Sequence, residues 1–325
     1  AATNALLPAV LLRGSEKYPD LRAITEKLDD LYGASVGASV RRVGDYQTTG
    51  LYCGFMDDRF ALPGDRVLAP MLDFLGELLL DSPLEKGGFR ADFVESEKKN
   101  LIATIESELN DKRAYFMSRL LRILCREDTF GIPRLGSRQQ VAAIPAKGLY
   151  DHYRRILQES PVELFYVGAA APEQVATLVK PVFADLSCRA MTLPAQTAVR
   201  DGGGKDFSEE MDVNQGKLCM GFVTPVTIRD EEFVAMQIMN MVFGGGVTGK
   251  LFMVIREQMS LCYAIGSAYH GTKGILTVSA GIDSSQEQTV RHQVLEQLRV
   301  CCEGRITDEE MTSAKKALIS SLRTI

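Results

Sequence analysis

The chain has 325 residues, of which 46% are apolar and 24% are charged. This balance is close to the average for globular proteins, so it excludes a disordered, fibrous or low-complexity chain, and the length is enough for about two domains. The 37 basic and 42 acidic residues give a formal net charge of −5. Because no basic block is longer than a pair such as Lys98-Lys99, we expect neither a nucleic acid nor a membrane surface as a partner.

The apolar runs and the cysteines indicate the compartment. No apolar run approaches the roughly 18 residues that a membrane helix needs, and the first residues lack the charged start and apolar centre of a signal peptide. The seven cysteines are an odd number without a C-x-x-C pair, which is typical of reduced thiols. These features predict a cytoplasmic protein.

The first half of the chain alternates between helical and strand patterns. Apolar residues at helical spacing predict a helix over Asp20–Tyr32, which Gly33 ends. Alternating residues over Val36–Val43 and Tyr46–Met56 predict two paired strands. The patterns that follow predict helices over Arg66–Leu80, Ala91–Leu109, Arg138–Leu157 (around Pro145) and Pro172–Phe183, and a buried strand over Val162–Gly168.

A flexible, polar segment at 193–207 predicts a linker, and the same order of elements follows it. Strands are predicted over Met211–Val223, Leu261–Ser267 and Ile275–Gly281, and helices over Glu231–Phe243, Gln288–Cys302 and Ile306–Leu322. The Lys98-Lys99 and Lys315-Lys316 pairs occupy matching places in the two halves. The repeat indicates a diverged duplication.

We therefore predict an α+β protein of two homologous lobes, 1–192 and 208–325, joined by the linker at 193–207. Each lobe is expected to be an antiparallel sheet with helices packed on one face, with a cleft between the lobes. The first lobe is expected to lack an N-terminal strand and the second to be incomplete at its C-terminal end.

The second lobe carries a glycine-rich run followed by two further short motifs. The run is Phe243-Gly244-Gly245-Gly246-Val247-Thr248-Gly249-Lys250-Leu251-Phe252, and Val254-Ile255-Arg256-Glu257 and Leu261-Cys262-Tyr263 follow it. It resembles the GGG-x-x-(S/G)-x-LF…RE-x-x-x-LxY signature of the insulinase/pitrilysin family of zinc metallopeptidases, which includes the mitochondrial processing peptidase. In the first lobe, Arg13-Gly14-Ser15, Phe130-Gly131 and Leu135-Gly136-Ser137 stand where the family has similar turns. The resemblance covers most of residues 4–325.

Active members of that family bind zinc through H-x-x-E-H on one helix and a Glu on a later helix, and the motif Glu takes a proton from the zinc-bound water. Counting back from Arg13-Gly14-Ser15 places the motif at Ala5–Ala9, where the sequence is Ala-Leu-Leu-Pro-Ala. The third ligand falls near Ala103-Thr104, although Glu106 and Glu108 are close enough for a different register. The resemblance thus implies no catalytic and no metal-binding residue here.

The three histidines do not replace the lost motif in the sequence. His152, His270 and His292 are far apart, and no two have the i, i+4 spacing of a helical zinc site. The chain is most similar to the bacterial YfmF-type branch of the family, whose members lack the motif and are paired with a homologue that has it. The resemblance therefore implies no cofactor in this chain, with zinc only in the active partner.

Five residues of the second lobe match substrate-binding positions of the family. Arg256 and Tyr263 match an Arg and a Tyr that hydrogen-bond the substrate in active relatives, and Gly244, Gly245 and Gly246 match a loop that binds presequences in the mitochondrial enzyme. The alternative is a surface helix end, a half-buried strand tyrosine and a helix stop with positive φ. A nucleotide loop is excluded, since neither G-x-G-x-x-G nor G-x-x-x-x-G-K-(S/T) fits.

Three hypotheses for the function follow. The first is a non-catalytic subunit that binds unfolded peptide and pairs with an active insulinase-like homologue, or with a second copy of itself. The second is an active zinc metalloendopeptidase whose ligands are misaligned or are supplied from outside the chain. The third is a structural scaffold without affinity for peptides.

Overall fold

The computed structural model describes residues 1–324 except 109, 185, 187–203, 212 and 214. The chain forms two compact units: unit 1 is Ala1–Ser107 with Pro133–Pro194, and unit 2 is Glu108–Ile132 with Ala195–Ile325. This differs from the division expected at 1–192, because Glu108–Ile132 belongs to unit 2. The predicted linker lies outside the described residues up to 203, and residues 204–207 form neither helix nor strand.

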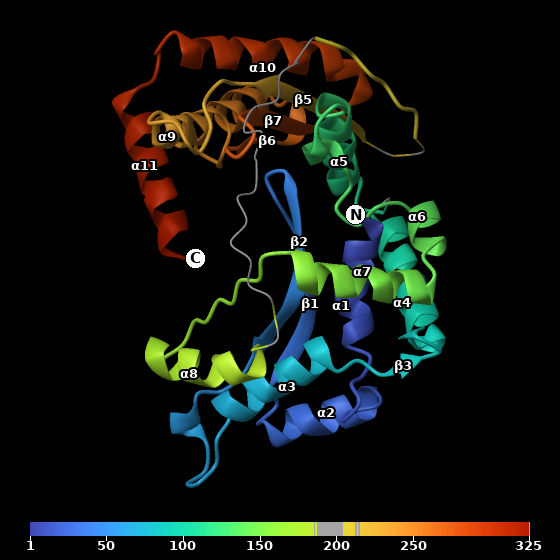
Figure 1. Ribbon diagram of the computed structural model, residues 1–325. Helices are drawn as coiled ribbons and strands as arrows, with labels where there is room; N and C mark the ends of the chain where they lie inside the picture. Colours follow the sequence, from blue (N-terminus) through green and yellow to red (C-terminus); the bar gives the residue numbers. More distant parts are fainter. Residues whose placement is uncertain (109, 185, 187–203, 212, 214, 325) are drawn as a thin grey trace. The chain divides into compact units, whose positions relative to one another are not determined.

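Unit 1 contains most of the helices and strands expected from the first half of the chain. Its main elements are α1 (Ala2–Leu11), α2 (Leu21–Asp30), β1 (Ser35–Val43), β2 (Tyr46–Gly54), α3 (Leu68–Leu80), α4 (Ala91–Ser107), α6 (Arg138–Ala142), α7 (Ala146–Glu159) and α8 (Pro172–Val182), with the short β3 (Leu84–Glu85), β4 (Gly88–Phe89) and the 3₁₀ turn η1 (Asp58–Phe60). Strands β1 and β2 form an antiparallel hairpin (Figure 1).

Local chemistry explains the ends of these elements, and three apolar clusters hold unit 1 together. The Asp20 side chain accepts a hydrogen bond from the Ala23 backbone N–H at 2.9 Å and caps α2. Gly33, with φ +71°, follows its C-terminal end. One cluster joins α1, α4, α6 and α7, a second joins α2, α3 and the hairpin, and a third joins α3 and α8.

The buried strand predicted over Val162–Gly168 is wrong. The structure has no strand there, and the side chains of Phe165 and Val167 are 86% and 99% exposed. The residues have strand propensity, but that propensity depends on packing against a paired neighbour. No strand among the described residues pairs with this segment.

Unit 2 is built on a three-stranded antiparallel sheet. Its elements are α5 (Lys112–Leu124), the 3₁₀ turn η2 (Thr129–Gly131), β5 (Gly216–Val223), α9 (Phe233–Phe243), the π-helix η3 (Leu251–Gln258), β6 (Cys262–His270), β7 (Ile275–Ile282), the 3₁₀ turn η4 (Ser284–Gln286), α10 (Glu287–Cys302) and α11 (Asp308–Arg323). The strand order is β5-β7-β6, so β7 is central (Figure 1).

Helices cover both faces of this sheet. Leu276, Val278, Ala280 and Ile282 of β7 pack in the main cluster with α9, η3, α10 and α11. Successive side chains of a strand point to opposite faces, and Ile275 accordingly packs with α5 through Leu121 and Leu124. The antiparallel sheet with packed helices agrees with the expectation, and α5 adds a cover on the second face.

An ion pair inside unit 2 joins the α5–η2 segment to the β6–β7 turn. Lys273 is fully buried, and its Nζ lies 2.8 Å from Oδ2 of Asp128. The other carboxylate oxygen of Asp128 accepts a hydrogen bond from the Phe130 backbone N–H at 2.7 Å. Across the part of the chain that the structure describes, no helix is long and apolar enough to cross a membrane.

Candidate peptide-binding site

Helix α1 carries the residues that occupy the expected zinc-motif positions. Ala5, Pro8 and Ala9 have no side-chain donor atom for a metal, and Pro8 lies inside the helix. Ala5 and Pro8 are buried among apolar neighbours. Zinc in this family needs two imidazoles and a carboxylate, so these residues do not fit the metal.

Of the two acidic residues that another register would use, Glu106 lies on α4 and Glu108 follows the end of that helix, and both are exposed. Glu106 forms an ion pair with Arg138 of α6. Ala103 and Thr104 lie on the exposed surface of α4, whereas the buried Glu97 contacts Arg13 at 3.4 Å. No group of three His, Cys, Asp or Glu side chains within the described ranges is placed to hold a metal ion.

The histidines take part in separate local contacts. The His152 Nδ1 lies 2.8 Å from Nη2 of Arg155, which can only donate, so the imidazole proton is on Nε2 and is donated to Oδ1 of Asn4 at 2.5 Å. Burial, together with the Arg155 charge, lowers the pKa of His152. His270 lies on β6, 3.4 Å from Oγ1 of Thr277, and His292 is exposed on α10.

Arg256 and Tyr263 lie together at the junction of η3 and β6. The Arg256 Nε donates a hydrogen bond to the backbone carbonyl of Tyr263 at 3.0 Å, and Nη1 lies 3.1 Å from Oε1 of Glu257. The guanidinium also lies over the Phe252 ring, 4.6 Å from its centroid. Arg256 therefore fixes the start of β6, while the Tyr263 side chain is 61% exposed. The helix that carries Arg256, η3, is a π-helix, a form often found at functional sites.

Gly244 and Gly245 pack closely, and α9 does end at Gly244, but the positive φ expected of such a helix stop is not found. Gly244 follows α9 with φ −168°, and none of the three glycines of the loop has a positive φ. A Cβ on Gly244 would lie 2.6 Å from Cδ1 of Leu251 and 3.0 Å from Oγ of Ser267. Glycine at 244 thus allows the loop, η3 and β6 to meet, whereas Gly246 has only an ordinary contact at 3.6 Å.

Strand β6 has an open edge beside this loop. Among the described strands, β7 alone pairs with β6. The Ser267 backbone N–H bonds to the Gly244 carbonyl at 2.8 Å and so points away from β7. Because backbone N–H directions alternate along an antiparallel strand, the Ile265 N–H also points to the open edge. A bulge between Cys262 and Ala264 breaks the regular ladder at Tyr263.

We name the residues Gly244–Gly246, Arg256 and Tyr263–Ile265 the edge site. Exposed apolar side chains on η3 and on the turn that follows it, Met253 and Met259, add to the exposed ring of Tyr263. An open strand edge beside apolar side chains is the arrangement by which proteins bind extended peptides.

The sequence analysis did not single out one residue next to this site, the buried Lys250, whose Nζ lies 2.6 Å from Oε1 of Glu310. Its one signal in the sequence is a lysine between the glycine-rich run and the apolar run that begins at Leu251.

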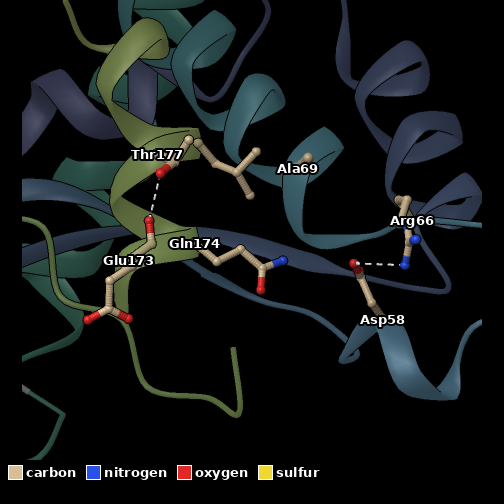
Figure 2. Close-up of a pocket in the computed structure, with 7 residues that line it drawn as sticks. Asp58, Arg66, Ala69, Glu173, Gln174 and Thr177 are labelled. Atoms are coloured by element: carbon tan, nitrogen blue, oxygen red, sulfur yellow. Dashed lines mark hydrogen bonds and ion pairs between the residues drawn. The ribbon is translucent and has the colours of Figure 1, made fainter. Parts of the chain in front are cut away.

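Unit 1 contains a separate hollow of about 580 Å³. Figure 2 shows it between α8 and the start of α3, with Gln174 extending into the space toward Asp58. The Asp58 carboxylate accepts hydrogen bonds from the Val67 and Leu68 backbone N–H groups at 2.7 and 2.9 Å, so it caps α3. The hollow is lined by Asp58, Arg66, Ala69, Glu173, Gln174, Thr177 and Leu178, none of which belongs to the edge site.

Comparisons with known proteins agree with these observations. Residues 143–318, more than half of the chain, match the family described as Peptidase M16 inactive domain. The probable inactive metalloprotease YmfF of Bacillus subtilis (strain 168) is 29% identical over 315 residues, which are 97% of this chain and 74% of that protein.

Two solved structures share the fold. A conserved protein from Enterococcus faecalis V583 has a TM-score of 0.87 at 26% identity, over 99% of this chain and 76% of that one. A peptidase M16 inactive domain from Pseudomonas fluorescens has a TM-score of 0.77 at 19% identity, over 98% and 74%. The insulinase-like resemblance is confirmed: the chain belongs to the peptidase M16 family, as a non-catalytic homologue of its zinc peptidases.

Proposed function

We propose that this chain binds unfolded peptide at the edge site and pairs with an active, zinc-containing M16 homologue. The observation that carries the proposal is the open edge of β6, where the Ile265 N–H points away from β7. An extended peptide added there forms main-chain hydrogen bonds whatever its sequence, which suits a subunit that receives unfolded chains.

The side chains around this edge suit the same ligand. Tyr263 is a large, rigid and exposed side chain of the kind that contributes most to binding energy. Met253 and Met259, each 43% exposed, are flexible and adapt to different apolar side chains. Arg256 holds the Tyr263 carbonyl, so it keeps the first residues of the edge in place.

The binding test uses fluorescently labelled β-casein, an unfolded polypeptide, and measures anisotropy. Tyr263→Ala is expected to weaken binding by at least about tenfold, as for an interface residue with a large energetic share. Tyr52→Ala is the matched control, since Tyr52 is a similarly exposed tyrosine (57%) on β2 of unit 1. Equal affinities for the wild type and Tyr263→Ala, or no binding by the wild type, would refute the peptide role. Cleavage of casein that a chelator stops would instead support the peptidase hypothesis.

Pairing is tested separately, by co-expression with an H-x-x-E-H homologue from the same genome. The motif positions of α1 carry no metal ligand, so the partner is the subunit expected to hold zinc and cleave the peptide. Light scattering after gel filtration should give a one-to-one complex. If this chain instead elutes as a homodimer or as a monomer, without the homologue present at equal concentration, the pairing is contradicted.

A further inference from the structure

A continuous set of contacts leads from α11 to the edge site. Glu310, in the first turn of α11, binds the Lys250 ammonium at 2.6 Å. Lys250 lies between Gly249 and Leu251, and both of these residues pack against Gly244 so closely that a Cβ at position 244 or 249 would clash. The Gly244 carbonyl in turn accepts the hydrogen bond from the Ser267 N–H in β6. The ion pair is therefore connected to the strand edge through the glycine loop.

The chemistry of the pair suits a role in placing the loop. The pair is partly buried, since the Lys250 side chain is 9% exposed and the Glu310 side chain is 25% exposed. An ion pair removed from water gives little net stability compared with apolar packing, but it has a directional geometry. The second oxygen of Glu310 accepts hydrogen bonds from the N–H and the hydroxyl of Thr307, at 2.8 and 3.2 Å. Lys250 thus binds one oxygen of the Glu310 carboxylate and Thr307 binds the other, so the position of the Lys250 ammonium relative to α11 is fixed.

We infer that Lys250 is a positioning residue for the edge site, and that its ion pair with Glu310 places the glycine loop so that the open edge of β6 can accept a peptide. This inference rests on the proposed peptide binding. Lys250 itself does not contact the peptide; it acts through Gly244 and Ser267.

The first test needs no peptide. Lys250→Met should remove the ion pair with Glu310, loosen the glycine loop and speed hydrogen exchange at the Ser267 amide. The exchange rate is measured in the full chain by NMR or by fragment-resolved mass spectrometry. Lys98→Met is the matched control, because Lys98 is a similarly buried lysine in unit 1, 2.8 Å from Glu95. Unchanged exchange at Ser267 in Lys250→Met would overturn the inference, whether or not the chain binds peptides.

The second test measures affinity for β-casein. Lys250→Met is expected to weaken binding between about twofold and thirtyfold, the range for residues that act without touching the ligand, and Lys98→Met to leave it unchanged. The double variant Lys250→Met with Glu310→Gln leaves no unpaired charge and keeps a capping-box residue, so it should recover thermal stability but stay weak in binding. Recovery of both stability and affinity would mean that the pair has only a structural role, and would overturn the inference. Absence of binding by the wild type would refute the proposed function, and the exchange result would still decide the role of Lys250.

Discussion

Breaking the ion pair between Lys273 and Asp128 should release the α5–η2 segment from unit 2. In Lys273→Met the Asp128 carboxylate stays buried, at 7% side-chain exposure, without its 2.8 Å partner. Removing one member of a buried pair costs about 3–5 kcal/mol because an uncompensated charge remains. For a unit of this size, that loss lowers the midpoint of thermal unfolding by roughly 2–4 °C per kcal/mol.

The double variant Lys273→Met with Asp128→Asn distinguishes the cost of the unpaired Asp128 charge from the cost of the altered side-chain packing. The asparagine oxygen can still accept the hydrogen bond from the Phe130 N–H, and no buried charge is left. We therefore expect the double variant to regain most of the lost stability, to within about 1 kcal/mol, as in other proteins where a buried pair is replaced as a whole.

Hydrogen exchange with mass spectrometry, together with circular dichroism for the thermal midpoint, measures both effects. In Lys273→Met, the amides of α5 and η2 should exchange faster. Lys250→Met is the control within the same unit, since its partner lies on α11, and it should leave α5 protected. If α5 and η2 keep their protection in Lys273→Met, the assignment of Glu108–Ile132 to unit 2 through this pair is refuted.

Three further predictions concern packing, thiol reactivity and pH. Gly244→Ala should destabilise unit 2 by about 1–3 kcal/mol in urea unfolding, because the added Cβ overlaps neighbouring atoms. Gly246→Ala should change the stability by no more than about 0.5 kcal/mol, and equal effects of the two variants would contradict the packing argument. Burial raises the pKa of Cys301 to about 11, so iodoacetamide at pH 8 should label the exposed Cys302 at least about ten times faster, and faster labelling of Cys301 in peptide mass spectra would be inconsistent with its burial. Burial and then the charge of Arg155 lower the pKa of His152 from 6.5 in the folded chain. The unfolded chain therefore binds the proton more readily, and the urea midpoint should fall as the pH drops below 6.5. His152→Gln should remove part of that fall, and an unchanged pH dependence in this variant would disprove the role given to His152.

Most helices and the hairpins follow from patterns that act over a few residues. The capping of α2 by Asp20 and the positive φ of Gly33 in the turn after the helix depend on neighbouring residues alone, and such signals are present in the sequence. The strand at Val162–Gly168 was predicted wrongly because a strand also needs a partner, which local sequence does not specify. The place of α5 in unit 2 depends on a contact between Asp128 and Lys273, which are far apart in the chain.

The edge site was predictable in part. The family resemblance indicated Arg256 and Tyr263, and the structure brings them together through the Tyr263 carbonyl. It did not indicate that Arg256 bonds the backbone of this chain, nor that Gly244 serves close packing with a negative φ. The pairing of Lys250 with Glu310 joins two helical segments, so only the folded arrangement reveals it.

The zinc content of the purified chain tests the central claim most directly. The protein should be prepared without an affinity tag, dialysed against micromolar zinc and measured by elemental analysis. Because Ala5, Pro8 and Ala9 offer no ligand, we predict less than about a tenth of an equivalent of zinc per chain. Close to one equivalent, lost together with a peptidase activity on treatment with a chelator, would contradict the conclusion that this M16 chain is non-catalytic.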